Sequence, residues 1–178
     1  MEFRLNTPLT NMNIQSLSVG DTVFLSGKMY TARDAAHKRM VELLKEGHSP
    51  PFSFEGQVVF YAGPCPAKPG RVIGSVGPTT SGRMDPYTPI LMEQGLRCMV
   101  GKGARNDVVS DTIRRLGGVY FIAIGGAAAL MSRCVTDVQM VAFPELGAEA
   151  VRMITVANFP VIVGIDASGR DIYRLRAN

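Results

Sequence analysis

The amino-acid sequence predicts an α/β fold in which mixed sheet layers carry helices packed on one side. Strands alternate with helices through the middle of the chain, which is typical of a parallel layer. Both ends of the chain are mostly β, which indicates a second β layer. The 178 residues, of which 46% are apolar and 19% charged, suffice for a hydrophobic core and exclude a disordered chain. A split near residue 55 would leave an N-terminal piece too small to stand alone, so we expect a single domain over residues 1–178.

The sequence pattern of the N-terminal part predicts two strands and a helix. The strands are Phe3–Leu5 and Thr22–Ser26, the second following a Gly-Asp turn. The helix spans Asp34–Lys45, because its apolar residues recur at helical spacing and Gly47 ends the pattern.

The middle of the chain predicts alternating strands and helices separated by many loops. Twelve of the 19 glycines lie between Gly63 and Gly126, which indicates turns with special backbone geometry. Asp85 is expected to cap a helix whose first residue, Pro86, is tolerated there. The expected strands are Gln57–Tyr61, Arg71–Val76, Arg97–Val100 and Val119–Ala123, and the expected helices are Pro86–Gln94, Asn106–Leu116 and Gly125–Arg133.

The C-terminal part predicts short strands only. They are Val138–Phe143, Arg152–Val156, Val161–Ile165 and, after a Ser-Gly turn, Ile172–Tyr173.

The cysteine and histidine content argues against a self-contained metal site. Cys65, Cys98 and Cys134 are dispersed without a CxxC motif, and the chain has two histidines, His37 and His48. Cys98 and Cys134 are expected in the core and Cys65 at the surface. None has the neighbouring base that a nucleophile needs.

Composition also limits which binding partners and which cellular compartment are expected. No apolar run approaches the roughly 18 residues of a membrane span, and the first residues lack the pattern of a signal peptide, so a cytoplasmic protein is expected. The net charge of +4 suggests an anionic partner. Nucleic acid is disfavoured, because aromatic residues make up 7%, tryptophan is absent and no basic stripe is present.

Three cations occupy junctions between a strand or loop and a helix. Arg33 precedes the helix from residue 34, Arg83 lies in GPTTSGRMD and Lys102 lies in VGKGAR. Because ligands of α/β sheets gather at the carboxyl ends of strands, these side chains could converge on one anion. Arginine supplies a bidentate fork for a carboxylate and lysine a point charge. The alternative is that each is a solvated surface charge.

The segment 77–85 permits two interpretations. Thr79, Thr80 and Ser81 offer hydroxyl groups and amides that could form an anion nest. They could equally form a capping turn whose hydroxyls bond to the backbone. The GxxxxGK[ST] spacing is missing, so the segment is not a nucleotide P-loop.

His37 follows Arg33 by four residues and would share its helix face. It could carry a proton, orient Arg33 or Asp34, or lie at the helix surface. An orienting or structural role is favoured.

Six segments in this order resemble the beta subunit of two-subunit class I iron–sulfur fumarases, to which tartrate dehydratase beta subunits are related. The resemblance covers residues 4 to 174. The segments are YTARDAAHKR (30–39), VVFYAGP (58–64), VGPTTSGRMDPYTP (76–89), VGKG (100–103), IGGAAAL (124–130) and AFPELGAEA (142–150).

The resemblance implies a swivelling β/β/α domain that contributes to the reversible hydration of fumarate to (S)-malate. It implies a [4Fe–4S] cluster held by a separate alpha subunit and not by this chain, which therefore would be inactive alone. Arg33, Arg83 and Lys102 match residues that bind the substrate carboxylates. Thr79, with Thr80 beside it, matches a threonine proposed as the base. Ala104 stands where relatives often have glycine.

Two other functions stay open. The substrate could be L(+)-tartrate or another hydroxy-dicarboxylate, although GRMD and ARDAAHKR are closer to the fumarase side. The chain could instead be a non-catalytic module that binds a dicarboxylate. In isolation, its partner-facing surface could also support a homodimer.

Overall fold

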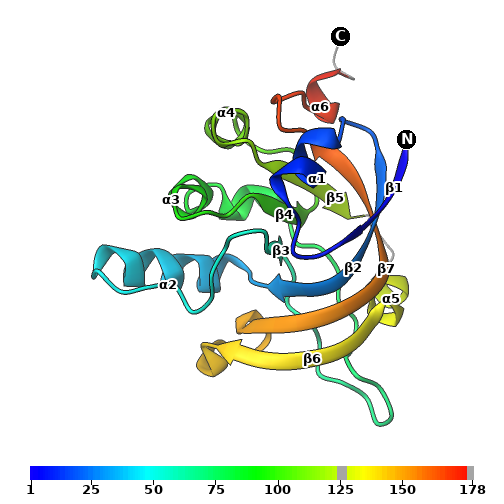
Figure 1. The fold of residues 1–178 in the computed structure, drawn as a ribbon. Coiled ribbons are helices and arrows are strands. Elements are labelled where there is room, and N and C mark those ends of the chain that lie inside the picture. The colour runs from blue at the N-terminus through cyan, green and yellow to red at the C-terminus, as the bar shows by residue number, and fades with distance from the viewer. Residues whose placement is uncertain (124–127, 176–178) are drawn as a thin grey trace.

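The computed structural model describes residues 1–123 and 128–175 and confirms the α/β class (Figure 1). The strands are β1 (Glu2–Asn6), β2 (Thr22–Thr31), β3 (Val58–Phe60), β4 (Cys98–Gly101), β5 (Val119–Ala123), β6 (Val135–Ala142) and β7 (Val151–Ile165). The helices are α1 (Asn11–Ser16), α2 (Asp34–Lys45), α3 (Thr88–Glu93), α4 (Asp107–Leu116), α5 (Ala128–Arg133) and α6 (Ile172–Leu175), and the 3-10 helices are η1 (Ser81–Met84) and η2 (Pro144–Glu149).

The strands form one sheet that closes on itself. β1 to β5 are parallel neighbours in chain order, which confirms the predicted parallel layer. β7 runs antiparallel to β5 and also pairs with β2, so β2, β3, β4, β5 and β7 make a ring. The expected separate second β layer is therefore corrected: β6 and β7 belong to the same sheet.

β7 is one strand where two were predicted. Residues 151–156 pair with β6, and residues 161–165 pair with β5, while β2 runs beside both halves. The two halves join at Asn158, which has a left-handed φ of 51° and donates its backbone N–H to the Ser26 hydroxyl at 3.0 Å. Asparagine tolerates this conformation, so the polar residue marks a bend and not a strand end.

Helices α2, α3 and α4 cover one side of the parallel strands, as predicted (Figure 1). Their apolar faces pack on outward side chains such as Tyr61, Met99 and Tyr120. The opposite face of the same strands lines the interior of the ring, where Phe60 and Phe121 are fully buried. Helices α1 and α5 pack on that second core, so the prediction of helices on one side holds for α2, α3 and α4 only.

Several predicted elements are wrong. Residues 71–76 form a loop and not a strand; it is closed by Cys65, whose N–H donates to Ser75 and whose carbonyl accepts from Gly74. Residues 172–175 are helical because Asp171 accepts the N–H of Tyr173 on its carboxylate. α1, η1 and η2 were not predicted. Residues 125–127 of the expected helix lie outside the described residues.

Within residues 1–123 and 128–175, no helix combines the length and apolar character needed to span a membrane.

Candidate functional site

Three segments meet at the carboxyl ends of β2, β3 and β4. Arg33 comes soon after β2, and Lys102 directly follows β4. The segment from Thr79 onward lies between these strand ends, because the Thr79 N–H donates to the Tyr61 carbonyl at 2.7 Å and the Ser81 N–H donates to the Lys102 carbonyl at 2.9 Å. Since the three strands are adjacent and parallel, the predicted cations occupy one edge of the sheet.

Arg33 is held by carboxylates at the start of α2. Its backbone is extended and it occupies the position before the first helical residue. Its Nε lies 3.3 Å from Oε1 of Glu149 and 3.7 Å from Oδ1 of Asp34. These three atoms are buried and form no hydrogen bond with any residue that the structure describes. Gly63 makes room for Arg33, because a Cβ at Gly63 would lie 3.0 Å from its Cδ.

His37 lies beneath Arg33, fully buried, so a helix-surface position is excluded. Its Nδ1 lies 2.8 Å from the Arg33 carbonyl oxygen, and its ring packs edge-on against Tyr61. Burial lowers the pKa of His37 to about 4, aided by the positive charge of Arg105 and opposed by the hydrogen bond to Arg33. The imidazole is therefore neutral near pH 7, which favours an orienting role over proton transfer.

Arg83 and Lys102 are exposed and pair with no carboxylate among the described residues. Arg83 lies in η1, and Lys102 pairs with Thr80 in an isolated parallel bridge. Arg33 is paired with Asp34 and Glu149, but Arg83 and Lys102 add two further positive charges, so this edge keeps excess positive charge that suits a ligand bearing carboxylates.

The anion-nest interpretation of residues 79–81 is wrong for two of its amides. The N–H groups of Thr79 and Ser81 are already bonded to strand-end carbonyls. The Ser81 hydroxyl lies 2.8 Å from the Tyr120 hydroxyl. The hydroxyls of Thr79 and Thr80 form no hydrogen bond to described residues, so both hydroxyls are available to a ligand.

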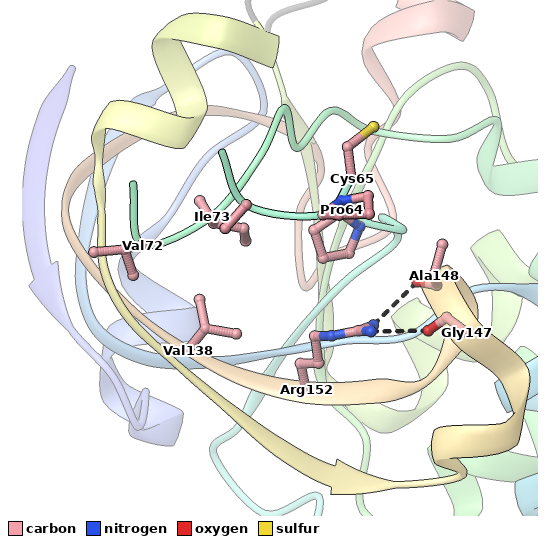
Figure 2. A pocket seen from close by; sticks show the side chains of 10 residues that line it. Pro64, Cys65, Val72, Ile73, Val138, Gly147, Ala148 and Arg152 are labelled. Carbon is pink, nitrogen blue, oxygen red and sulfur yellow. Dashed lines mark hydrogen bonds between the residues drawn. The ribbon is translucent and has the colours of Figure 1, made fainter. Parts of the chain in front are cut away.

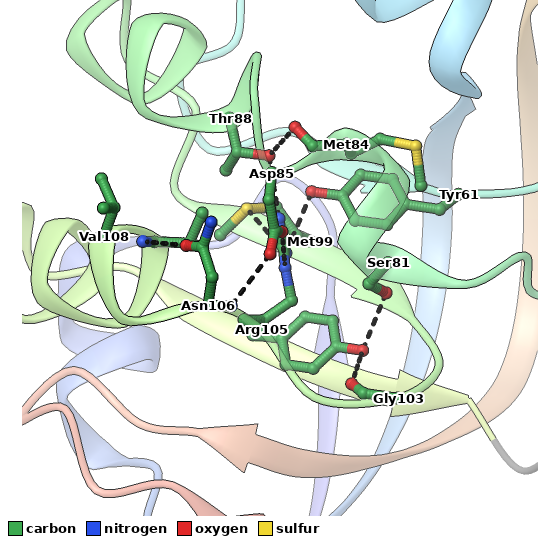
Figure 3. A network of polar contacts seen from close by, with 12 residues as sticks. Tyr61, Ser81, Met84, Asp85, Thr88, Met99, Gly103, Arg105, Asn106 and Val108 are labelled. Carbon is green, nitrogen blue, oxygen red and sulfur yellow. Dashed lines mark hydrogen bonds and ion pairs between the residues drawn. The ribbon is translucent and has the colours of Figure 1, made fainter.

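A buried polar network under this edge was not anticipated (Figure 3). Asp85 does not cap residues 86–94; α3 begins at Thr88, and the Asp85 carboxylate accepts from Arg105 Nε at 2.6 Å and from the Asn106 N–H at 2.9 Å. A buried guanidinium is a stronger partner for a carboxylate than helix amides are. Arg105 ends the VGKGAR segment, but no role was predicted for it, because its burial cannot be inferred from spacing along the chain.

A separate cavity of about 400 Å³ lies between the loop around Cys65, strand β6 and η2 (Figure 2). Its walls are mainly apolar, including Val72, Ile73 and Val138. Among the described residues that line it, the cation is Arg152, which donates to carbonyls of Gly147 at 2.8 Å and Ala148 at 3.2 Å. Because these donors are directed at the chain itself, this cavity is a poor carboxylate site.

The described residues do not fit as ligands of an iron–sulfur cluster. No group of three His, Cys, Asp or Glu side chains comes together in residues 1–123 and 128–175. Cys65 is exposed, Cys98 is buried with its pKa raised by burial to about 12, and Cys134 is partly exposed, where a core position was expected. A cluster needs deprotonated, convergent thiolates, which this arrangement lacks.

Comparisons with known proteins agree with this architecture. A family model described as Fumarase C-terminus matches residues 1–175. Fumarate hydratase 2 of Leishmania major is 39% identical over 87% of this chain and 28% of its own length. The anaerobic class I fumarate hydratase of Escherichia coli is 35% identical over 98% of this chain and 32% of its own length.

The chain thus spans about a third of these fumarate hydratases, but it spans nearly all of another relative. A protein of Methanocaldococcus jannaschii, assigned as an L(+)-tartrate dehydratase beta subunit, is 41% identical over 97% of this chain and 91% of its own length. The family match over almost the whole chain, together with these identities, decides the classification. The chain belongs to the Fumarase C-terminus family.

Proposed function

We propose that this chain is the beta subunit of a two-subunit class I iron–sulfur hydro-lyase that hydrates fumarate reversibly to (S)-malate. Family membership and the fumarate hydratase relatives support the reaction class. The near-complete coverage of a relative assigned as a beta subunit supports the two-subunit organisation. The partner is then a larger alpha subunit, and both subunits are cytoplasmic.

The observation that carries the proposal is the set of three cations at one sheet edge. Fumarate and malate carry two carboxylates each. Arg33 and Arg83 would each bind one carboxylate through paired N–H donors, and Lys102 would add a point charge between the segments. The same cations would stabilise the charge that develops on the carboxylate beside the reacting carbon.

Thr79 is proposed to hold or move the proton at the reacting carbon. Its hydroxyl has no hydrogen-bond partner among the described residues. Arg83 follows it by four residues in the same turn, and Lys102 pairs with the neighbouring Thr80 in a parallel bridge. An alcohol is a weak base in water, but nearby positive charge lowers the cost of its alkoxide. Thr80, on the neighbouring residue, would complete the substrate contacts, with Asp34 and His37 supporting Arg33.

The cluster is proposed to be bound by the alpha subunit, because the described thiols of this chain are dispersed. Residues 1–178 are proposed to act as a single swivelling domain that closes on the cluster-bearing subunit. Closure would bring the three cations to the substrate and exclude water.

The test is an assay of the reconstituted pair. Purified alpha and beta subunits are combined, and turnover of fumarate, (S)-malate and L(+)-tartrate is measured beside each subunit alone. We expect turnover of fumarate and malate by the pair only. The variants R83M and K102M should each lower kcat/KM at least tenfold, because each loses a charged contact.

The second candidate substrate is L(+)-tartrate, supported by the name of the Methanocaldococcus jannaschii relative, which is 41% identical to this chain. Dehydration of tartrate without fumarate turnover would select it. Turnover of neither dicarboxylate would refute the hydro-lyase proposal, and tight malate binding by the beta chain alone would then identify a dicarboxylate-binding module.

A further inference from the structure

Arg105 is a fully buried arginine that touches both loops of the proposed carboxylate site (Figure 3). It follows Lys102 by three residues in the same loop. It also reaches residues outside this loop: its Nε donates to Asp85 Oδ1 at 2.6 Å, and its Nη2 donates to the Thr88 hydroxyl at 2.8 Å. Thr88 in turn donates to the Met84 carbonyl at 2.8 Å, at the end of η1. The guanidinium thus joins the Lys102 loop to the segment that carries Arg83.

Two tyrosines enclose this guanidinium, and they also connect the Lys102 loop to the segment that carries Arg83. The Arg105 Cζ lies 5.3 Å and 5.1 Å from the ring centroids of Tyr61 and Tyr120. The Tyr120 hydroxyl lies 2.8 Å from the Ser81 hydroxyl and donates to the Gly103 carbonyl at 2.8 Å. Tyr61 receives a hydrogen bond from Arg105 at 3.3 Å, and its carbonyl accepts the Thr79 N–H. The contacts of the two tyrosines therefore end on one of the two loops or on a strand end that supports them.

The second carboxylate oxygen of Asp85 completes the link. It accepts the Asn106 N–H at 2.9 Å, and Asn106 in turn caps α4 through the Val109 N–H at 2.9 Å. The network thus extends from η1 through the Lys102 loop to a ten-residue helix packed on the sheet.

A buried ion pair is a poor source of net stability, because removing both charges from water offsets most of their attraction. Its geometric demands are strict, however, and it can enforce a unique arrangement of the elements it joins. Burial would lower the pKa of Arg105, but Tyr61, Asp85 and Tyr120 raise it above its ordinary value, so the cation persists at all working pH values.

We propose that Arg105, through Asp85, is a positioning residue that sets the spacing between the Thr79–Arg83 turn and Lys102. The inference rests on the proposed function, because that spacing matters where both loops bind one substrate. A displacement of about 1 Å between groups that hold a substrate is enough to lower a rate a hundredfold.

The test compares R105K with R170K in the complex with the alpha subunit. R105K keeps the charge but cannot reach Asp85, Thr88 and Tyr61 together. R170K makes the same exchange at another arginine, which pairs with the buried Asp166 at 2.8 Å in the C-terminal turn. We expect kcat/KM of R105K to fall at least tenfold, with kcat lowered and KM raised, while R170K stays within twofold of wild type.

Two further measurements separate positioning from loss of fold. The double variant R105M/D85L replaces the ion pair by an apolar one; it should retain cooperative unfolding while activity stays low. Amide hydrogen exchange of the R105K chain should quicken at Ser81 and Asn106 and stay unchanged in β7.

Activity of R105K within twofold of wild type, unchanged exchange at Ser81 and Asn106, or an equal loss in R170K would overturn the inference. A wild-type complex inactive on every dicarboxylate would instead refute the proposed function. The exchange measurement would still decide whether Arg105 holds the two loops.

Discussion

The Nδ1 of His37 lies 2.8 Å from the backbone carbonyl oxygen of Arg33, one helical turn earlier. The same oxygen accepts the His37 backbone N–H at 2.9 Å. A neutral imidazole that donates from Nδ1 therefore fixes the backbone from which the Arg33 side chain projects. The opposite ring nitrogen, Nε2, is buried and has no hydrogen-bond partner within residues 1–123 and 128–175. A protonated ring would place an unpartnered charge there.

This arrangement predicts a loss of stability in acid. The pKa of His37 is about 4 in the fold and near 6.5 when unfolded, so the unfolded state binds more protons between these values. The stability from a neutral His37 is full above about pH 6.5 and is lost as pH falls toward 4, by an amount on the order of 3 kcal/mol. Urea unfolding from pH 7.5 to 4.5 measures it.

His37→Asn is the informative variant, because its amide can still donate to the Arg33 carbonyl but does not titrate. Its unfolding free energy should depend less on pH than that of wild type. His48→Asn, which changes the exposed second histidine, should keep the wild-type dependence. Equal slopes in His37→Asn and wild type would show that another group is responsible.

Arg33→Lys should lower the activity of the reconstituted enzyme, whereas the same exchange at a surface arginine of α2 should not. Lysine keeps the charge near Glu149 but loses the paired donors that fit a carboxylate. A charged hydrogen bond contributes about 1.5–3 kcal/mol, so kcat/KM should fall roughly 10- to 100-fold. Steady-state kinetics with fumarate test this, and Arg39→Lys on the exposed face of α2 is the control. Comparable losses in both variants would place the effect in the helix and not in the site.

Gly101→Ala should displace the turn that carries Thr79. An added Cβ would lie 2.0 Å from the Ser81 hydroxyl oxygen and 2.8 Å from a Tyr61 ring carbon. Overpacking of this kind lowers the unfolding free energy by about 1–3 kcal/mol. Gly82→Ala, in the same region, meets no atom within 4 Å and should change stability by less than about 0.5 kcal/mol. Urea unfolding compares the two, and equal midpoints would contradict the tight packing.

The chain alone should not assemble a cluster. Anaerobic reconstitution with iron and sulfide should leave it without the brown absorbance, while the pair with the alpha subunit should acquire it. Total iron and the visible spectrum are measured. A brown isolated chain whose colour disappears in Cys65→Ser would show that this chain supplies a ligand after all.

Local patterns predicted α2, α4 and β5 well, because each signal lies within one element. The bounds Asp34–Lys45 and Val119–Ala123 were predicted without error. The local sequence pattern gave a wrong prediction where a partner strand decides whether a segment becomes a strand. Residues 71–76 read as a strand, but no sheet edge pairs with them, and a strand without a partner leaves its backbone groups unsatisfied.

The sequence by itself determined the α/β class and the placement of Arg33 and Lys102 at strand–helix junctions. Parallel strands in chain order then bring such junctions to one edge. Arg83 reaches the same edge through the backbone hydrogen bonds of Thr79 and Ser81, because the strand predicted before it, at 71–76, is a loop. Only the tertiary structure decided that the sheet closes through β7, that Glu149 faces Arg33 and that Asp85 pairs with Arg105 instead of capping a helix. These relationships join residues 20 or more positions apart, and their partners are selected by burial and close packing, which no local pattern encodes.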